Sequence, residues 1–106
     1  MCKVVNLRKE KYTVYCGRPG KGITYAPFGN QFIVGKDGER GECREKFRQY
    51  LLSNDNKSNN LLDIIKKIIK KDDILGCFCG AGKCHADFIA AYVNSDFDIE
   101  SIRKEP

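Results

Sequence analysis

The sequence predicts an α/β fold, a small Rossmann-like sandwich with a mixed sheet and about three helices. Short apolar segments rich in β-branched and aromatic residues alternate with longer segments of helical periodicity, an order typical of helices packed on a sheet. One apolar segment, residues 74–79, leads into a glycine-rich turn and a helical segment. The 106 residues suit one domain, which we place at residues 1–95, with a charged C-terminal tail at 96–106.

The first two strands are expected at residues 3–7 and 12–16, which read KVVNL and YTVYC. The segment between them, residues 8–11, is too short for a parallel crossover, so we expect a hairpin-like or offset antiparallel pair and therefore a mixed sheet. Residues 17–38 are rich in glycine and are expected to form a long functional or mobile loop. Within this loop, residues 31–34 are a candidate for a further short strand.

Two helices are expected before the central strand. Asp37 is placed to cap the first, which runs to about Leu52. Its core-facing stripe consists of Cys43, Phe47, Tyr50 and Leu51. The polar residues 53–60 predict a surface linker, and a second helix is expected over residues 61–71 with Asn60 as its cap.

A functional site is expected in residues 73–94, whose sequence is typical of a buried strand followed by a turn and a helix. The turn, GAGK at residues 80–83, precedes a helical pattern that begins at Cys84. A helix N-terminus presents free N–H groups that bind phosphate or carboxylate, and ligands of α/β folds bind outside the carboxyl ends of strands. These rules select residues 80–85, and they add Asn6 and Arg8 if their strand runs parallel to the central one.

The composition favours an anionic partner without choosing one. The formal net charge is +5, from 19 basic and 14 acidic residues. No secretory signal and no membrane-spanning apolar segment is recognised, so we expect a cytoplasmic protein with no membrane partner. The six cysteines are then expected to be reduced. No cofactor is expected, and a homo-oligomer is left open.

A zinc site is the first of three hypotheses for the cysteines and the single histidine. Cys77, Cys79, Cys84 and His85 are suitable ligand types. Their spacing is unfavourable, because the adjacent side chains of Cys84 and His85 diverge by about 100° on a helix. We therefore expect no metal.

Nucleophilic catalysis is the second hypothesis. A helix N-terminus and Lys83 would favour the thiolate form of Cys84 or Cys79, with His85 as the base. Adjacent residues seldom form the required thiol–imidazole hydrogen bond, so His85 would have to serve Cys79 across the turn. Catalytic residues stay unknown at this point, and so does whether the protein is an enzyme.

Binding of a phosphorylated small molecule is the third hypothesis and the one we prefer. Gly80, Gly82 and Lys83 would cradle a phosphate, although the spacing is not that of a Walker motif. The guanidinium of Arg18 would add a second phosphate contact, while His85 and Asp87 would read a ribose or a base. Asn6 and Asn30 either contact the ligand or satisfy loop backbone groups. The predicted ligand-binding set is Asn6, Arg8, Arg18, Asn30, Cys79, Gly80, Gly82, Lys83, Cys84, His85 and Asp87.

The chain also resembles an uncharacterised family of small phage and bacterial proteins, a domain of unknown function. The resemblance covers most of the chain and rests on VVNLRK (residues 4–9), VYCGRP (14–19), FGNQFIVGKDG (28–38), EKFRQYL (45–51), LGCFC (75–79) and KCHAD (83–87). The corresponding family blocks usually read GNPF and CHGD. This chain has Gln31 in place of the proline of the first block and Ala86 in place of the glycine of the second. The resemblance implies a compact α/β domain with a nucleotide-type pocket and supplies no reaction.

These observations predict a protein that binds a phosphorylated nucleotide or a nucleotide-derived molecule of the ADP-ribose type. If the source is a phage, sequestering a host defence signal is an attractive role. One alternative is an enzyme that processes a nucleotide or glycosidic bond with Cys84, His85 and Asp87. Another is non-specific nucleic-acid binding by the basic face of the second helix, which consists of Lys66, Lys67, Lys70 and Lys71.

Overall fold

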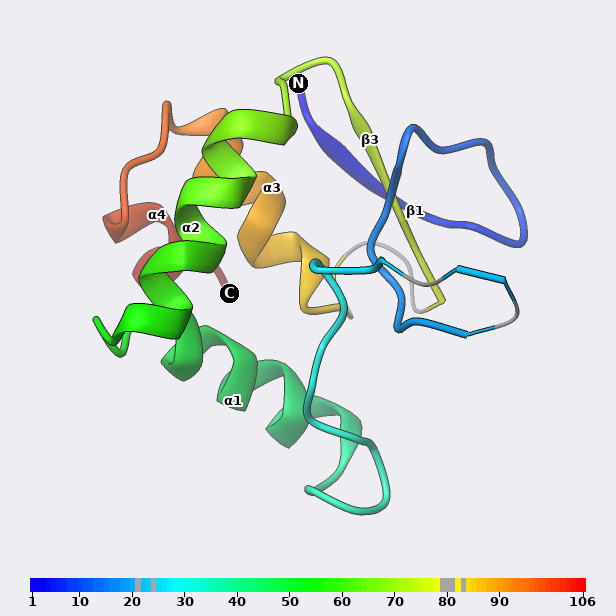
Figure 1. Cartoon of the computed structure of the whole chain (residues 1–106), viewed down its shortest axis with the longest axis horizontal. Coiled ribbons are helices and arrows are strands. Elements are labelled where there is room, and N and C mark those ends of the chain that lie inside the picture. Colours follow the sequence, from blue (N-terminus) through cyan, green and yellow to red (C-terminus); the bar gives the residue numbers. More distant parts are fainter. Residues whose placement is uncertain (21, 24, 79–81, 83) are drawn as a thin grey trace.

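A computed structural model of the chain describes residues 1–20, 22–23, 25–78, 82 and 84–106. Within them lie three strands and four helices, which confirms the α/β class (Figure 1). The strands are β1 (Lys3–Asn6), β2 (Val14–Tyr15) and β3 (Ile74–Cys77). The helices are α1 (Arg40–Leu51), α2 (Asn56–Ile68), α3 (Ala86–Asn94) and α4 (Glu100–Lys104).

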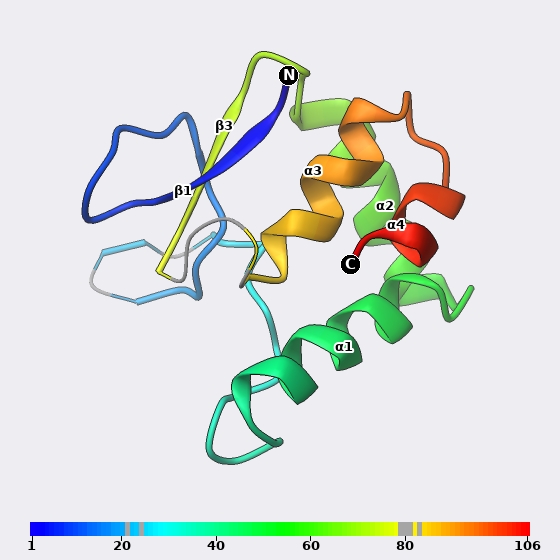
Figure 2. The same cartoon turned by 180° about the vertical axis from the view of Figure 1, so that it is seen from behind.

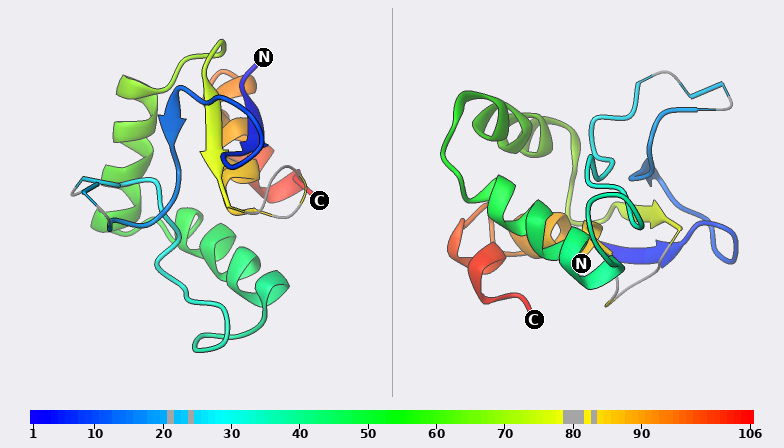
Figure 3. Two further views of the ribbon diagram at one scale, coloured as in Figure 1. Left: turned by 90° about the vertical axis from the view of Figure 1, so that its right-hand side faces the viewer. Right: turned by 90° about the horizontal axis from the view of Figure 1, so that it is seen from below.

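The sheet is parallel, so the prediction of a mixed sheet is wrong. Its strand order is β1-β3-β2, and β3 pairs in parallel with both neighbours. Val4 and Val14 both lie opposite Leu75, one on each side. The three strands lie side by side with β3 in the middle (Figure 3, left). The antiparallel hairpin expected from the short connection is excluded, because β1 and β2 pair with β3 instead of with each other.

Residues 7–13 connect β1 to β2 by passing over the face of β3 without a helix. The ring of Tyr12 lies against Gly76, where a Cβ atom would be 2.5 Å from Tyr12 Cγ. The amide of Thr13 donates to the carbonyl of Ile74 at 2.9 Å. An extended chain gains about 3.3 Å per residue, so seven residues suffice to cross one strand. Because Gly76 has no side chain, the connection can lie directly on the sheet.

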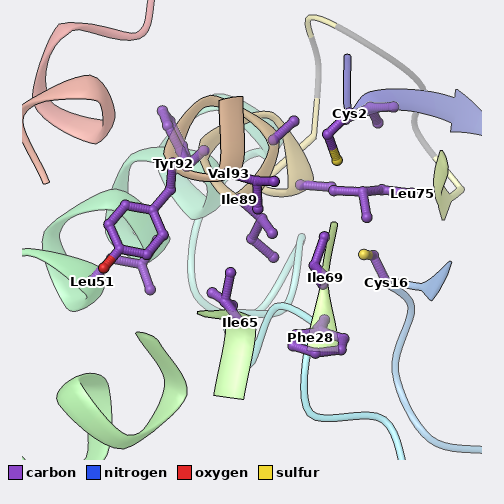
Figure 4. Close-up of a cluster of buried hydrophobic side chains, with 14 of the residues drawn as sticks. Cys2, Cys16, Phe28, Leu51, Ile65, Ile69, Leu75, Ile89, Tyr92 and Val93 are labelled. Atoms are coloured by element: carbon purple, nitrogen blue, oxygen red, sulfur yellow. The ribbon is translucent and has the colours of Figure 1, made fainter. Parts of the chain in front are cut away.

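The other face of the sheet is covered by helices, which gather on one side of the molecule (Figures 1 and 2). Alternation along β3 directs Leu75 and Cys77 to this side, and both are buried in the hydrophobic core. Figure 4 shows Leu75 near Ile69 from the end of α2 and Ile89 from α3. Asn94 at the end of α3 also holds β1, because its side-chain amide exchanges two 2.8 Å hydrogen bonds with the backbone of Cys2.

The second helix begins earlier than predicted. Asp55 is its cap and accepts a 2.8 Å hydrogen bond from the amide of Ser58, whose hydroxyl accepts from the amide of Asp55 in return. This reciprocal capping stabilises the first turn, so residues 56–60 are helical and the linker is shorter than expected. The helix ends at Ile68, before Lys70 and Lys71.

Two other segments differ from the sequence-based expectations. Residues 31–34 form bends and a turn in place of a short strand. The C-terminal tail, placed outside the domain at residues 96–106, contains helix α4, and Ile102 from this helix is fully buried. The guanidinium of Arg48 on α1 donates to the carbonyl of Arg103 at 3.1 Å, which ties the end of the chain to α1.

Candidate functional site

A cavity of about 530 Å³ lies at the carboxyl ends of the three strands. Leu7 after β1, Cys16 after β2 and Cys77 at the end of β3 all line it. The remaining walls come from the loop between β2 and α1, the first turns of α1, and Cys84 and His85 before α3. Parallel strands end at one edge of the sheet, so the topology gathers these segments in one place.

Positive charge and aromatic rings characterise the cavity lining. Arg18, Arg40 and Arg44 contribute guanidinium groups, and no aspartate or glutamate is present among the described residues that line it. Four aromatic residues also line the cavity: Tyr12, Tyr15, Phe32 and Phe78. The hydroxyl of Tyr15 donates to the carbonyl of Arg18 at 2.8 Å, which fixes this ring beside the loop. An anion that carries an aromatic group is chemically suited to this lining.

Cys84 and His85 form a thiol–imidazole contact in the cavity wall. Sγ of Cys84 lies 3.2 Å from Nδ1 of His85, and Nε2 of the same ring lies 2.7 Å from the carbonyl oxygen of Phe28. A carbonyl only accepts hydrogen bonds, so Nε2 carries the proton of the neutral ring and Nδ1 is left as an acceptor for the thiol. The direct contact differs from the expectation that adjacent residues seldom meet in this way.

Burial keeps His85 neutral. It lowers the pKa of the imidazole below its ordinary value of 6.5, and this outweighs the hydrogen bonds to backbone carbonyls that act in the opposite direction. The ring packs against Phe47 of α1 in a T-shaped arrangement, with 4.9 Å between ring centroids. The imidazole is therefore held on two sides, by Phe28 and by Phe47.

Asp87 supports the turn before α3 from inside the protein. Its carboxylate accepts hydrogen bonds from the amides of Gly82 at 3.1 Å and Cys84 at 3.3 Å, and it pairs with Arg44 at 3.1 Å. A carboxylate at this position complements the positive end of the helix dipole. These two amides, expected to face a ligand phosphate, donate to the protein's own anion. A bound phosphate would displace Asp87 or lie elsewhere in the cavity.

Asn6 and Arg8 lie at the carboxyl end of β1, which is parallel to β3, but neither lines the cavity. The side chain of Asn6 accepts a 3.0 Å hydrogen bond from the amide of Arg8. The guanidinium of Arg8 lies over the ring of Phe78, 5.1 Å from its centroid. Both side chains organise the connection after β1.

Asn30 lines the cavity and also holds its loop. Its amide nitrogen donates to the carbonyl of Cys43 at 3.2 Å, and its oxygen accepts from the amide of Phe32 at 3.0 Å. Four predicted site residues thus meet in the cavity: Arg18, Asn30, Cys84 and His85. Gly82 and Asp87 lie beside it, while Cys79, Gly80 and Lys83 are outside the described residues.

Arg40 and Arg44 were not predicted as site residues, although the helical pattern of α1 could have indicated them. Both lie within one turn of Cys43, which belongs to the predicted core-facing stripe of α1. The rings of Tyr12 and Phe78 were also missed, since their positions depend on the path of the connection over β3.

Of the basic face predicted on the second helix, Lys66 and Lys67 lie in the last turn of α2. Lys71 pairs with Asp96.

No set of three or more metal-ligating side chains comes together in the part of the chain that the structure describes. The described helices also include none that is long and apolar enough to cross a membrane.

No curated protein and no solved structure matches the chain. One family model does match, that of a domain of unknown function (DUF4326), over residues 3–95. Because this match covers most of the sequence and the entire sheet, the chain belongs to the DUF4326 family.

Proposed function

We propose that the cavity binds a phosphorylated nucleotide or a nucleotide-derived small molecule of the ADP-ribose type. The observation that carries this proposal is one cavity with three arginines and four aromatic rings at the carboxyl ends of parallel strands. In Rossmann-like folds this edge of the sheet is where nucleotides bind. The small parallel sheet, with helices following β3, is in keeping with such an arrangement.

Size supports a small-molecule ligand. Sites for drug-sized ligands and cofactors have volumes of about 300–1,000 Å³, and this cavity has about 530 Å³. An extended nucleic acid would need an open groove that continues beyond this volume. A nucleotide-sized molecule is therefore the better match to the cavity.

The charges support a phosphate contact at Arg18 and Arg40. Arg44 already pairs with Asp87 and lies over the ring of Phe88, 4.4 Å from its centroid. Arg18 and Arg40 are exposed, and no hydrogen bond or ion pair is found for either guanidinium in the described part of the chain. A planar guanidinium pairs well with the oxygens of a phosphate, so these two side chains are the proposed anion contacts.

The aromatic residues support stacking of a nucleobase. Tyr12 and Tyr15 lie 6.3 Å apart between ring centroids and are tilted by 46°, and Phe78 contributes a third ring to the lining of the same cavity. Base–aromatic stacking stabilises binding by about 1–3 kcal/mol per base. Binding of this kind would suit a protein that sequesters a nucleotide signal, as a phage protein acting against host defence would do.

Isothermal titration calorimetry of the purified protein with ADP-ribose tests the proposal. We expect saturable binding that weakens by about tenfold to 100-fold in Arg18→Gln, because a hydrogen bond to a charged group contributes about 1.5–3 kcal/mol. Arg103→Gln is the matched control, since Arg103 is an exposed arginine of α4 paired with Glu100, and it should bind as the wild type does.

Adenosine and ribose 5-phosphate separate the contributions of the base and the phosphate in the same experiment. Each should bind more weakly than ADP-ribose. The proposal fails if ADP-ribose gives no binding, or if Arg18→Gln and Arg103→Gln behave alike. Tight binding of a single-stranded oligonucleotide that falls steeply with salt, and is lost in a Lys66→Gln, Lys67→Gln variant, would favour the nucleic-acid alternative instead.

A further inference from the structure

The cavity contains a thiol that faces a base. Sγ of Cys84 lies 3.2 Å from Nδ1 of His85, and the hydrogen bond from Nε2 to Phe28 leaves Nδ1 as an acceptor for the thiol. Cys84 is 3% exposed and His85 is 8% exposed, yet both line the cavity. A small electrophile in the cavity would therefore meet a thiol that has a proton acceptor next to it.

Cys43 provides an internal comparison. It lines the same cavity and is 1% exposed, but its Sγ donates to the carbonyl of Gly38 at 3.6 Å. A backbone carbonyl is not a base at neutral pH, whereas a neutral imidazole is. Cys16, also in the cavity wall, is buried in a setting that raises its pKa. Among these three thiols, only Cys84 has an imidazole within hydrogen-bonding distance.

We propose that Cys84 is a nucleophile with His85 as its base, and that it cleaves the glycosidic bond of a nucleotide-derived ligand. This inference rests on the proposed function. The proton of Sγ moves to Nδ1, and the sulfur forms a bond to the anomeric carbon of the ribose. The bond from that carbon to the leaving base breaks, and the proton on Nδ1 passes to the base. Water then attacks the same carbon, gives a proton back to the sulfur through Nδ1, and releases the sugar with a hydroxyl group.

Asp87 favours attack on carbon over attack on phosphorus. A thiol that attacks a phosphate needs neighbouring amides to hold the phosphate oxygens, but the amides of Gly82 and Cys84 hold the carboxylate of Asp87. This negative charge also repels a phosphate close to the sulfur. The phosphate is then directed to Arg18 and Arg40, and the neutral sugar lies nearest Cys84. Asp87 acts as a positioning residue, since it fixes the backbone of Cys84 and pairs with Arg44.

Labelling with iodoacetamide, read out for each cysteine by peptide mass spectrometry, tests the nucleophile without any ligand. At pH 7 we expect Cys84 to react about 100-fold faster than Cys43, the comparably buried thiol of the same cavity. His85→Gln keeps a side-chain amide near the position of Nε2 and removes the base at Nδ1. This variant should slow the labelling of Cys84 to the rate of Cys43 and leave Cys43 unchanged. Circular dichroism confirms that it is folded.

Equal labelling rates for Cys84 and Cys43 in the wild type, or an unchanged rate for Cys84 in His85→Gln, would overturn the proposal that Cys84 is a nucleophile with His85 as its base. Neither result touches the proposed function, because ADP-ribose binding is measured separately by calorimetry. The two proposals therefore fail independently in these experiments.

The glycosidic step is tested with β-NAD⁺, which joins a nucleotide to a ribose that carries nicotinamide as a leaving group. Nicotinamide leaves as a neutral molecule, so with this substrate the proton stays on Nδ1 until it returns to the sulfur, and the proton of the attacking water is released to solvent. We expect the wild type to release nicotinamide and Cys84→Ser to release none, while Cys84→Ser still binds ADP-ribose. An ADP-ribosyl adduct on the Cys84 peptide, trapped by acid quenching, would show the covalent intermediate. No release of nicotinamide by the wild type, or equal release by Cys84→Ser, would contradict the step.

Discussion

His85 connects the loop at Phe28 to Cys84 through its two ring nitrogens. It is the only histidine, it is buried, and both ring nitrogens have partners, the carbonyl of Phe28 and the thiol of Cys84. Burial disfavours the charged form, so its pKa is lowered from 6.5. One neutral ring therefore orients the loop at Phe28 and accepts a hydrogen bond from Cys84.

The lowered pKa of His85 predicts that the protein loses stability in mild acid. The unfolded chain takes up a proton as pH falls below about 6.5, while the folded protein takes it up only at lower pH, so unfolding is favoured across this window. The free energy of unfolding should fall by up to about 1.4 kcal/mol per pH unit in that range. Urea denaturation at pH 7.5, 6.5 and 5.5 measures the slope.

His85→Gln is the control, because glutamine does not titrate. The variant should be less stable at pH 7.5, since a well-packed ring is lost, but its stability should change less than that of the wild type between pH 6.5 and 5.5. Parallel slopes for the two proteins would show that another group causes the acid sensitivity.

Among the elements, the connection over β3 does the most to shape the site. Residues 7–13 bring Tyr12 onto Gly76, and both Leu7 and Tyr12 line the cavity. Thr13 holds the far end of the connection, since its hydroxyl donates to Asp73 at 2.8 Å and its amide to the carbonyl of Ile74. The absence of a side chain at position 76 is what allows this close approach.

Gly76→Ala should therefore destabilise the protein. The added Cβ would lie 2.5 Å from Cγ of Tyr12, and overpacking of this kind costs about 1–3 kcal/mol. Gly41→Ala is the matched control: a Cβ there meets no atom within 4 Å, and alanine favours the helix by up to about 1 kcal/mol. Thermal unfolding of both variants gives the comparison. A Gly76→Ala protein as stable as the wild type would contradict the close packing of Tyr12.

The sequence predicted the elements better than their boundaries and pairing. The apolar strand after residue 73, the stripe containing Cys43 and Phe47, and the helix after Cys84 are all present. The start of α2 was missed because Asp55 and Ser58 were read as parts of a polar linker, although they form a reciprocal cap. Strand direction was missed because it depends on β3, which is distant in sequence from β1 and β2.

At the scale of the whole molecule, the topology brings together residues that are distant in sequence. Arg18, Arg44 and His85 come from a loop, a helix and a turn, and all three line one cavity. The rule about strand ends led to Cys84 and His85, while Arg18 was predicted from the fit of its guanidinium to phosphate and Asn30 from its place in the loop. Rules of this kind could not find Arg40, Arg44 or the aromatic rings, whose positions depend on how α1 and the connection over β3 pack in three dimensions.

The central claim is that a nucleotide-type anion occupies the cavity at the carboxyl ends of β1, β2 and β3. Titration of ¹⁵N-labelled protein with ADP-ribose, followed by two-dimensional NMR, tests it most directly. We expect the largest chemical-shift changes on the backbone amides of Gly17, Arg18, Arg44 and Phe78, and no change at Lys66 and Lys67 on α2. Changes centred on Lys66 and Lys67, or no change anywhere at saturating ADP-ribose, would contradict it.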